Sequence, residues 1–127
     1  MNKILFIEDE DEYRAFITPI LQENGWEVHT AVNGADGLRL FRTAKMETQP
    51  FDLIITDSVM PMMTGIELTA RIRMENKELP IFVLSGYEDS REKALKAGCS
   101  RFMLKPIRRS ELVEFVHMDL QTSKEEE

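Results

Sequence analysis

Carboxylate, hydroxyl and ammonium groups follow short apolar segments at several points of this sequence. They are Glu8, Asp9, Glu10, Asp57, Ser85 and Lys105. Two carboxylates about 4 Å apart repel each other by roughly 4 kcal/mol at an effective dielectric constant near 20, so a cluster of them needs a cation. Oxygen ligands without a histidine or thiolate favour magnesium. Magnesium beside an aspartate indicates phosphoryl chemistry, in which the carboxylate of Asp57 is the nucleophile and forms an aspartyl phosphate.

The segments that lead to these residues have the pattern of buried strands. Residues 3–7, 51–56, 80–85 and 101–105 are short and largely apolar, as strands are when both faces of a parallel sheet are covered. Residues 26–31 alternate apolar and polar side chains, which predicts an edge strand with one wetter face.

Helical patterns separate the predicted strands. The first helix has an apolar stripe that is closed by Gly25, and Pro19 inside it should cost about 3 kcal/mol or kink the helix. The stripe comprises Tyr13, Phe16, Ile17, Ile20 and Leu21. Asn33 is the predicted cap of the second helix. The fourth helix, near residues 89–97, offers only a thin apolar surface.

The other helices also present apolar residues at helical spacing. These are Leu38, Phe41, Leu68, Ile72, Leu112, Phe115, Val116 and Leu120. Strands and helices alternate through five units, which predicts a doubly wound α/β domain. Because ligands bind at the carboxyl ends of the strands in such a sheet, we expect the polar residues named above to converge there.

The composition is that of an ordinary single domain. The chain has 127 residues, 31% of them charged, and a net charge of -7, which argues against non-specific attraction to nucleic acid or anionic lipid. Its one cysteine, Cys99, excludes an internal disulfide and suits a reducing compartment. No apolar run approaches the roughly 18 residues of a membrane span, and the N-terminal MNKILFIEDE turns acidic too soon for a signal peptide. We therefore expect a cytoplasmic protein.

Four motifs occur in order along the chain, and they are ILFIEDE, DSVMPMMTG, VLSGY and FMLKP. Together they resemble the receiver domain of response regulators, the CheY-like family, over residues 3 to about 120. The resemblance implies a doubly wound, five-stranded parallel sheet of order 2-1-3-4-5 with five helices, a flavodoxin-like fold. We expect the receiver domain to occupy residues 1–121, followed at 122–127 by an acidic tail or the start of a linker.

The resemblance also implies a role for each residue of the site. Asp57 would accept the phosphoryl group, while Lys105 and Ser85 would bind its oxygens. The ligands of Mg²⁺ would be Glu8 (through water), Asp9, Asp57 and the backbone carbonyl of Val59. Ser85 and Phe102 would form the conformational switch, and Pro106 would follow a cis peptide bond.

By the same resemblance, the domain is a phosphorylation-switched receiver of a two-component signalling system. A sensor histidine kinase or phosphotransfer protein would donate the phosphoryl group in a magnesium-dependent reaction. The domain would promote its own phosphorylation and dephosphorylation, but it would act primarily as a switch that changes its partner-binding surface. Its partner would be an output domain or target protein, without direct nucleic-acid or membrane binding, and a phosphorylation-dependent homodimer remains open.

Three positions depart from the family pattern. Glu8 replaces the commoner aspartate, and Phe102 stands where many members have tyrosine. Arg108 occupies the position where an Asp or Ser often caps the last helix, a bond that arginine cannot accept. Phe102 therefore has a competing interpretation as an inert core residue.

Three other classes of protein compete with the receiver interpretation. A haloacid-dehalogenase-like phosphatase needs a second acid two residues after Asp57, where Val59 stands. A flavodoxin-like flavin or dinucleotide binder needs a glycine-rich phosphate loop, and none follows the first strand. A receiver-like adaptor that never takes phosphate is disfavoured because Asp9, Ser85 and Lys105 accompany Asp57.

Overall fold

The computed structural model describes residues 1–125, with side chains up to residue 120, and contains one sheet of five parallel strands. The strands are β1 (Lys3–Ile7), β2 (Glu27–Ala31), β3 (Leu53–Asp57), β4 (Ile81–Ser85) and β5 (Arg101–Leu104). Their order is β2-β1-β3-β4-β5, which confirms the predicted fold class and the predicted edge position of the second strand.

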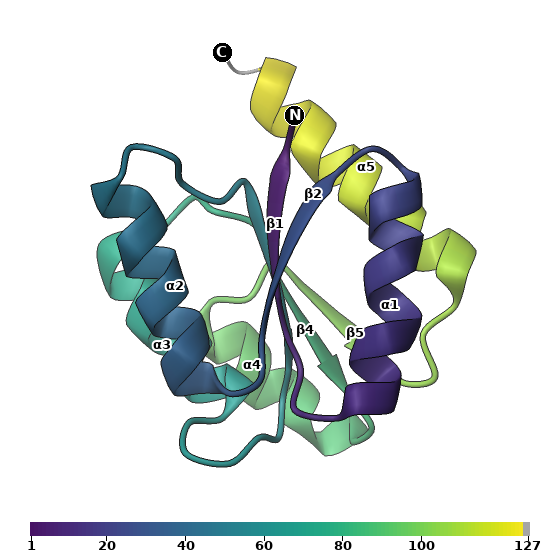
Figure 1. Cartoon of the computed structure of the whole chain (residues 1–127). Coiled ribbons are helices and arrows are strands. Elements are labelled where there is room, and N and C mark those ends of the chain that lie inside the picture. Colours follow the sequence, from purple (N-terminus) through teal and green to yellow (C-terminus); the bar gives the residue numbers. More distant parts are fainter. Residues whose placement is uncertain (126–127) are drawn as a thin grey trace.

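The helices form a layer on each face of the sheet (Figure 1). They are α1 (Asp11–Glu23), α2 (Gly34–Met46), α3 (Gly65–Glu75), α4 (Arg91–Ala97) and α5 (Arg109–Glu125), and a short 3-10 turn, η1 (Glu88–Ser90), precedes α4. Helices α1 and α5 cover one face, and α2, α3 and α4 cover the other. This is the doubly wound arrangement that the alternating pattern predicts.

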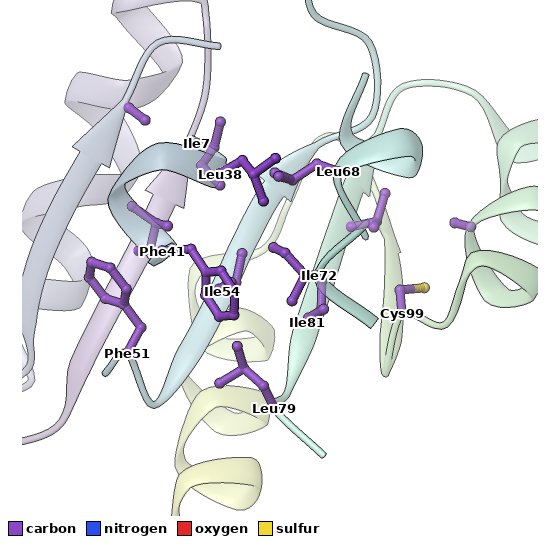
Figure 2. Close-up of a cluster of buried hydrophobic side chains, with 14 of the residues drawn as sticks. Ile7, Leu38, Phe41, Phe51, Ile54, Leu68, Ile72, Leu79, Ile81 and Cys99 are labelled. Carbon is purple, nitrogen blue, oxygen red and sulfur yellow. The ribbon is translucent and has the colours of Figure 1, made fainter. Parts of the chain in front are cut away.

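The core consists of two clusters because successive strand residues point to opposite faces of the sheet. In β1, Leu5 and Ile7 belong to the cluster beneath α2, α3 and α4, part of which Figure 2 shows. Their neighbours Ile4 and Phe6 belong to the cluster beneath α1 and α5. All four side chains are fully buried. The continuous apolar runs of the sequence therefore supply both cores at once.

Several helix ends have a clear local cause. Asn33 caps α2 as predicted, since its side chain accepts a hydrogen bond from the backbone N–H of Asp36 at 2.8 Å. Thr64 caps α3 in the same way, by accepting from Glu67 N at 3.1 Å. Helix α4 ends at Gly98, whose φ of 109° is in the left-handed region that glycine adopts readily.

The predicted stripe of α1 is wrong at one position. Ile17, Ile20 and Leu21 are buried, but the Phe16 side chain is 52% exposed and its ring packs edge-on against Tyr13. Phe16 lies about 100° around the helix axis from Ile17. The predicted apolar stripe is therefore wider than the face of α1 that contacts the sheet, and Phe16 lies at the margin of the stripe. Pro19 lies inside α1, as the sequence predicts.

Strand β3 begins two residues and ends one residue later than predicted, and β5 ends one residue earlier than predicted. Phe51 is buried but precedes β3, and Lys105 follows β5. Helix α5 continues to Glu125, and residues 126–127 lie outside the described part of the chain, so the predicted division between a domain at 1–121 and a tail at 122–127 stays a prediction. Among the described residues, no helix has the length and apolar character that crossing a membrane requires.

Candidate functional site

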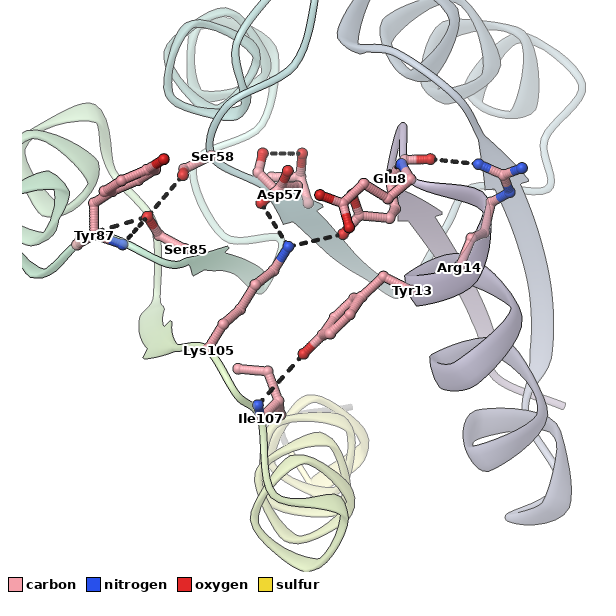
Figure 3. Close-up of polar contacts among 11 residues, drawn as sticks. Glu8, Tyr13, Arg14, Asp57, Ser58, Ser85, Tyr87, Lys105 and Ile107 are labelled. Atoms are coloured by element: carbon pink, nitrogen blue, oxygen red, sulfur yellow. Dashed lines mark hydrogen bonds and ion pairs between the residues drawn. The ribbon is translucent and has the colours of Figure 1, made fainter.

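Glu8, Asp57 and Lys105 meet at the carboxyl edge of the sheet (Figure 3). Strands β1 and β3 pair with Ile7 opposite Thr56, so the next residues, Glu8 and Asp57, lie side by side at the carboxyl edge of the sheet. The Lys105 ammonium lies 3.1 Å from Glu8 Oε1 and 3.1 Å from Asp57 Oδ1. The structure thus joins residues from three separate strand ends in one charged cluster.

Asp9 completes a set of three carboxylates. Ligand oxygens of Glu8, Asp9 and Asp57 all lie within 4.8 Å of one another. Glu8 is fully buried and Asp57 nearly so, whereas Asp9 is exposed, so the set opens to solvent at Asp9. Three hard oxygen ligands in this arrangement fit Mg²⁺, which keeps several waters and takes few carboxylates from the protein.

The electrostatics of the cluster also fit a cation. Burial, and then the charge of Asp57, raise the pKa of Glu8 to about 7 despite the opposing ammonium of Lys105. Burial likewise raises the pKa of Asp57, although Lys105 opposes it. Burial disfavours the charged form of Lys105, but the two carboxylates outweigh it and raise the Lys105 pKa. One ammonium therefore does not fully compensate the carboxylates, and a divalent cation would favour their ionised forms.

Ser85 lies beside this cluster with its hydroxyl engaged. Ser58 Oγ donates to Ser85 Oγ at 2.8 Å, and the backbone N–H of Tyr87 donates to the same oxygen at 3.1 Å. Ser58 and Ser85 are both buried, while the Tyr87 side chain is exposed. Sequence reasoning missed Ser58, because only the pairing of β3 with β4 places it next to Ser85.

Helix α1 supports the cluster from the other side. Arg14 Nη1 donates to the carbonyl oxygen of Glu8 at 2.7 Å. The Lys105 ammonium lies 4.3 Å from the centre of the Tyr13 ring, and the Tyr13 hydroxyl accepts from Ile107 N at 3.3 Å. Sequence reasoning assigned Tyr13 only to the apolar stripe and gave Arg14 no role. The sequence did contain a signal for Tyr13, namely an aromatic residue in the first turn of the helix that follows the acidic segment.

The loop after Asp57 folds back tightly on the strand. Gly65 N donates to the Ser58 carbonyl at 3.0 Å, and a Cβ atom at Gly65 would lie 1.9 Å from the carbonyl oxygen of Asp57. Within the loop, Met60 is buried, whereas Val59 is 57% exposed. The loop sequence is therefore constrained by packing, and its glycine by a close approach of two backbones.

The remaining predicted residues lie around the end of β5. Phe102 is 8% exposed, and the Arg91 guanidinium lies over its ring at 4.7 Å from the ring centre. The Lys105–Pro106 peptide bond is cis. Arg108 directly precedes α5, and its carbonyl accepts from Leu112 N at 3.0 Å.

Comparison with known proteins agrees with this fold and shows the family. The model of the response regulator receiver domain matches residues 4–117. A probable transcriptional regulatory protein of Picosynechococcus is 35% identical over 115 residues, which cover 87% of this chain and 46% of that protein. The chain thus spans about half the length of this curated relative.

Solved structures show the same architecture. A response regulator receiver domain protein from Clostridium thermocellum has a TM-score of 0.87 at 28% identity, and 98% of each chain is covered. The response regulator TrrA from Thermotoga maritima, solved in complex with Mg²⁺ and BeF, has a TM-score of 0.82 at 32% identity over 94% of this chain and 99% of that one. From its four motifs, its strand order and the family match, the chain belongs to the response regulator receiver domain family.

Proposed function

We propose that Asp57 accepts a phosphoryl group from a phosphohistidine of a sensor kinase or phosphotransfer protein. The observation that carries this proposal is the position of Lys105, whose ammonium lies 3.1 Å from both Asp57 and Glu8. A lysine already paired with the nucleophile can pass to an oxygen of the incoming group without a large movement. The phosphoacceptor, the cation site and the lysine would thus be assembled before the donor arrives.

Mg²⁺ is the proposed cofactor of this site. Asp9 and Asp57 would bind it directly, Glu8 would act through water, and the Val59 carbonyl would supply a further oxygen. When bound, the ion neutralises charge on the transferring phosphoryl oxygens. The complex of the Thermotoga protein with Mg²⁺ and BeF supports this proposal, since beryllium fluoride imitates a phosphoryl group.

In the transfer step, a carboxylate oxygen of Asp57 attacks phosphorus. The bond between phosphorus and the histidine nitrogen breaks, and its electron pair remains on that nitrogen. Lys105 donates to one phosphoryl oxygen, and the Ser85 hydroxyl donates to another. Hydrolysis later reverses the modification, as water attacks phosphorus and the bond to Asp57 breaks to release inorganic phosphate. Both steps depend on placement, which the rigid sheet edge provides.

The switch would run from Ser85 to Phe102. Movement of Ser85 toward the phosphoryl group would open space at the end of β4, and Phe102 would reorient in response. A cavity of about 310 Å³ next to Phe102, lined also by Arg91 and Leu104, gives the surrounding surface room to change. Helix α4 would shift with this surface, because its apolar contact is thin: Ala94 is buried, whereas Leu95 is 49% exposed.

The partners and setting follow from the family. We propose a cytoplasmic receiver domain over residues 1–121 that controls an output domain or a separate target. The transcriptional regulator among its relatives is about twice as long, which supports control of transcription through a further domain. The domain itself would not bind nucleic acid. A homodimer formed on phosphorylation would be one way for the domain to control its output.

Incubation with acetyl phosphate, followed by intact mass spectrometry, tests this proposal. The wild type should gain one phosphoryl group with Mg²⁺ and none with EDTA, and Asp57→Asn should gain none in either buffer. Asp52→Asn is the matched control, because Asp52 precedes β3 and accepts a hydrogen bond from Lys3 N at 2.8 Å, far from the site. Equal labelling of Asp57→Asn and the wild type would refute the proposal.

A further inference from the structure

The hydroxyl groups of Ser58 and Ser85 form a buried pair. Ser58 Oγ donates to Ser85 Oγ at 2.8 Å, and the two residues are only 2% and 0% exposed. Ser85 Oγ also accepts from Tyr87 N at 3.1 Å and donates to the Tyr87 carbonyl at 3.4 Å. In the part of the chain that the structure describes, the hydrogen bonds of the Ser85 hydroxyl run to Ser58 and Tyr87, and none runs to Asp57.

We propose that Ser58 is a positioning residue that holds Ser85 in its unphosphorylated arrangement and so lowers the affinity of the site for a phosphoryl group. This inference rests on the proposed function, in which Ser85 donates its hydroxyl proton to a phosphoryl oxygen. A serine hydroxyl has only one proton to donate. That proton must therefore leave the Tyr87 carbonyl, and the movement of Ser85 toward the phosphoryl group, which belongs to the proposed function, would take its oxygen away from Ser58.

The main chain of Ser58 is held on both sides and cannot follow Ser85. Its N–H donates to the Leu84 carbonyl at 2.9 Å, and its carbonyl accepts from Gly65 N at 3.0 Å. These two bonds fix Ser58 to β4 on one side and to the start of α3 on the other. Figure 3 shows the resulting arrangement, with Ser58, Ser85 and Tyr87 on one side of Asp57 and Glu8 on the other.

The departure of Ser85 thus leaves a buried hydroxyl without a partner. A buried polar group that loses its hydrogen bond carries the cost of its desolvation, and here that cost falls only on the phosphorylated arrangement. Ser58 therefore shifts the equilibrium of the switch toward the resting state. Removal of its hydroxyl relieves the cost while it leaves Asp57, Lys105 and the carboxylates in place.

Binding of beryllium fluoride in the presence of Mg²⁺, measured by calorimetry, tests this inference at equilibrium. Ser58→Ala should lower the dissociation constant about 5-fold or more, which corresponds to about 1 kcal/mol, the lower end of the cost of leaving a buried polar group without a partner. Ser58→Thr keeps the hydroxyl and should restore the wild-type constant. Ser100→Ala is the control, since Ser100 Oγ accepts from Ile81 N at 3.0 Å at the opposite end of β4, and it should leave the constant unchanged.

Two results would overturn the inference. One is a dissociation constant in Ser58→Ala that equals or exceeds that of the wild type, and the other is a Ser58→Thr variant that behaves like Ser58→Ala. Asp57→Asn separates this inference from the proposed function: if it binds beryllium fluoride as well as the wild type does, the proposed function fails and the inference falls with it. If Asp57→Asn does not bind but Ser58→Ala matches the wild type, only the inference fails.

A measurement on the wild type covers the case in which Ser58→Ala does not fold. Scalar couplings in NMR spectra report the χ1 rotamer of Ser85 with and without beryllium fluoride. The inference predicts that the rotamer changes when the ligand binds. The same Ser85 rotamer in both states would refute it.

Discussion

Lys105 Nζ lies 3.1 Å from Asp57 Oδ1 although another strand separates their own strands in the sheet. Lys105 follows β5 and Asp57 ends β3, so the lysine side chain extends across the end of β4 to reach the carboxylate. At the end of this side chain, the Lys105 ammonium lies over the Tyr13 ring, 4.3 Å from the ring centre. The position of Lys105 therefore depends on Tyr13 as well as on its two carboxylate partners.

Tyr13→Leu should slow phosphorylation by acetyl phosphate about 2- to 5-fold, because a cation–π contact of this kind contributes about 0.5–1 kcal/mol. Tyr13→Phe keeps the ring and loses only the hydroxyl that accepts from Ile107 N, so its rate should stay closer to that of the wild type. The rate of mass gain in saturating Mg²⁺ is the measurement. A Tyr13→Phe variant as slow as Tyr13→Leu would show that the hydroxyl matters and the ring does not.

Glu8→Gln should change how the stability of the metal-free protein depends on pH. The folded-state pKa of Glu8 is raised from 4.5 to about 7, first by burial and then by Asp57. Between these values the folded protein binds more protons than the unfolded chain, so wild-type stability falls as pH rises through this window. Glutamine cannot titrate, and the variant should lack this part of the decline.

Urea unfolding in EDTA at several pH values between about 5 and 8 measures the effect. The stability of Glu8→Gln relative to the wild type should increase with pH up to about pH 7 and level off above it. A difference between the two proteins that is constant across this range would contradict the raised pKa.

Most of the site could be predicted because its members end the strands of one parallel sheet. Glu8, Asp57, Ser85 and Lys105 each end or follow a short apolar run, and such runs have a common carboxyl edge. The cap of α2 could also be predicted, since Asn33 precedes the helix at the position where an amide side chain accepts from the first turn.

The rest depends on contacts between elements. Nothing in the sequence around Ser58 indicates its contact with Ser85. The contact arises because β3 pairs with β4, which places the two serines side by side. Tyr13 has the spacing of a core residue, yet its ring contacts a lysine from the far end of the chain. Phe16 was predicted on the core face of α1 and is exposed, because apolar spacing alone does not say how wide the contact with the sheet is.

Gly65→Ala should lower the free energy of unfolding by about 1–3 kcal/mol, the usual cost of forcing extra atoms into a packed site. The new Cβ atom would lie 1.9 Å from the Asp57 carbonyl oxygen, so the loop or the strand end must shift. Gly86→Ala is the control, since a Cβ atom there meets nothing within 4 Å. Urea unfolding of both variants decides the matter, and equal stabilities would contradict the close approach.

Val59→Asn should make the phosphorylated state decay faster. By resemblance to the family, the side chains of Val59 and Tyr87 would flank the approach of the hydrolytic water, and both are exposed, at 57% and 61%. Valine cannot orient a water, whereas an asparagine amide can, and placement of the water is the main requirement of this step. Loss of the phosphoryl mass with time at equal Mg²⁺ measures the effect. Decay no faster than that of the wild type would rule out this role for Val59.

Reductive trapping of the phosphorylated wild type tests the central claim most directly. Borohydride reduces the acyl phosphate of an aspartyl residue to the alcohol, which leaves homoserine in place of the aspartate. Peptide mapping by mass spectrometry after treatment with acetyl phosphate and Mg²⁺ should find this conversion at Asp57, and the same treatment in EDTA should find none. Conversion at Asp9, Glu8 or another carboxylate, with Asp57 intact in the phosphorylated protein, would contradict the assignment.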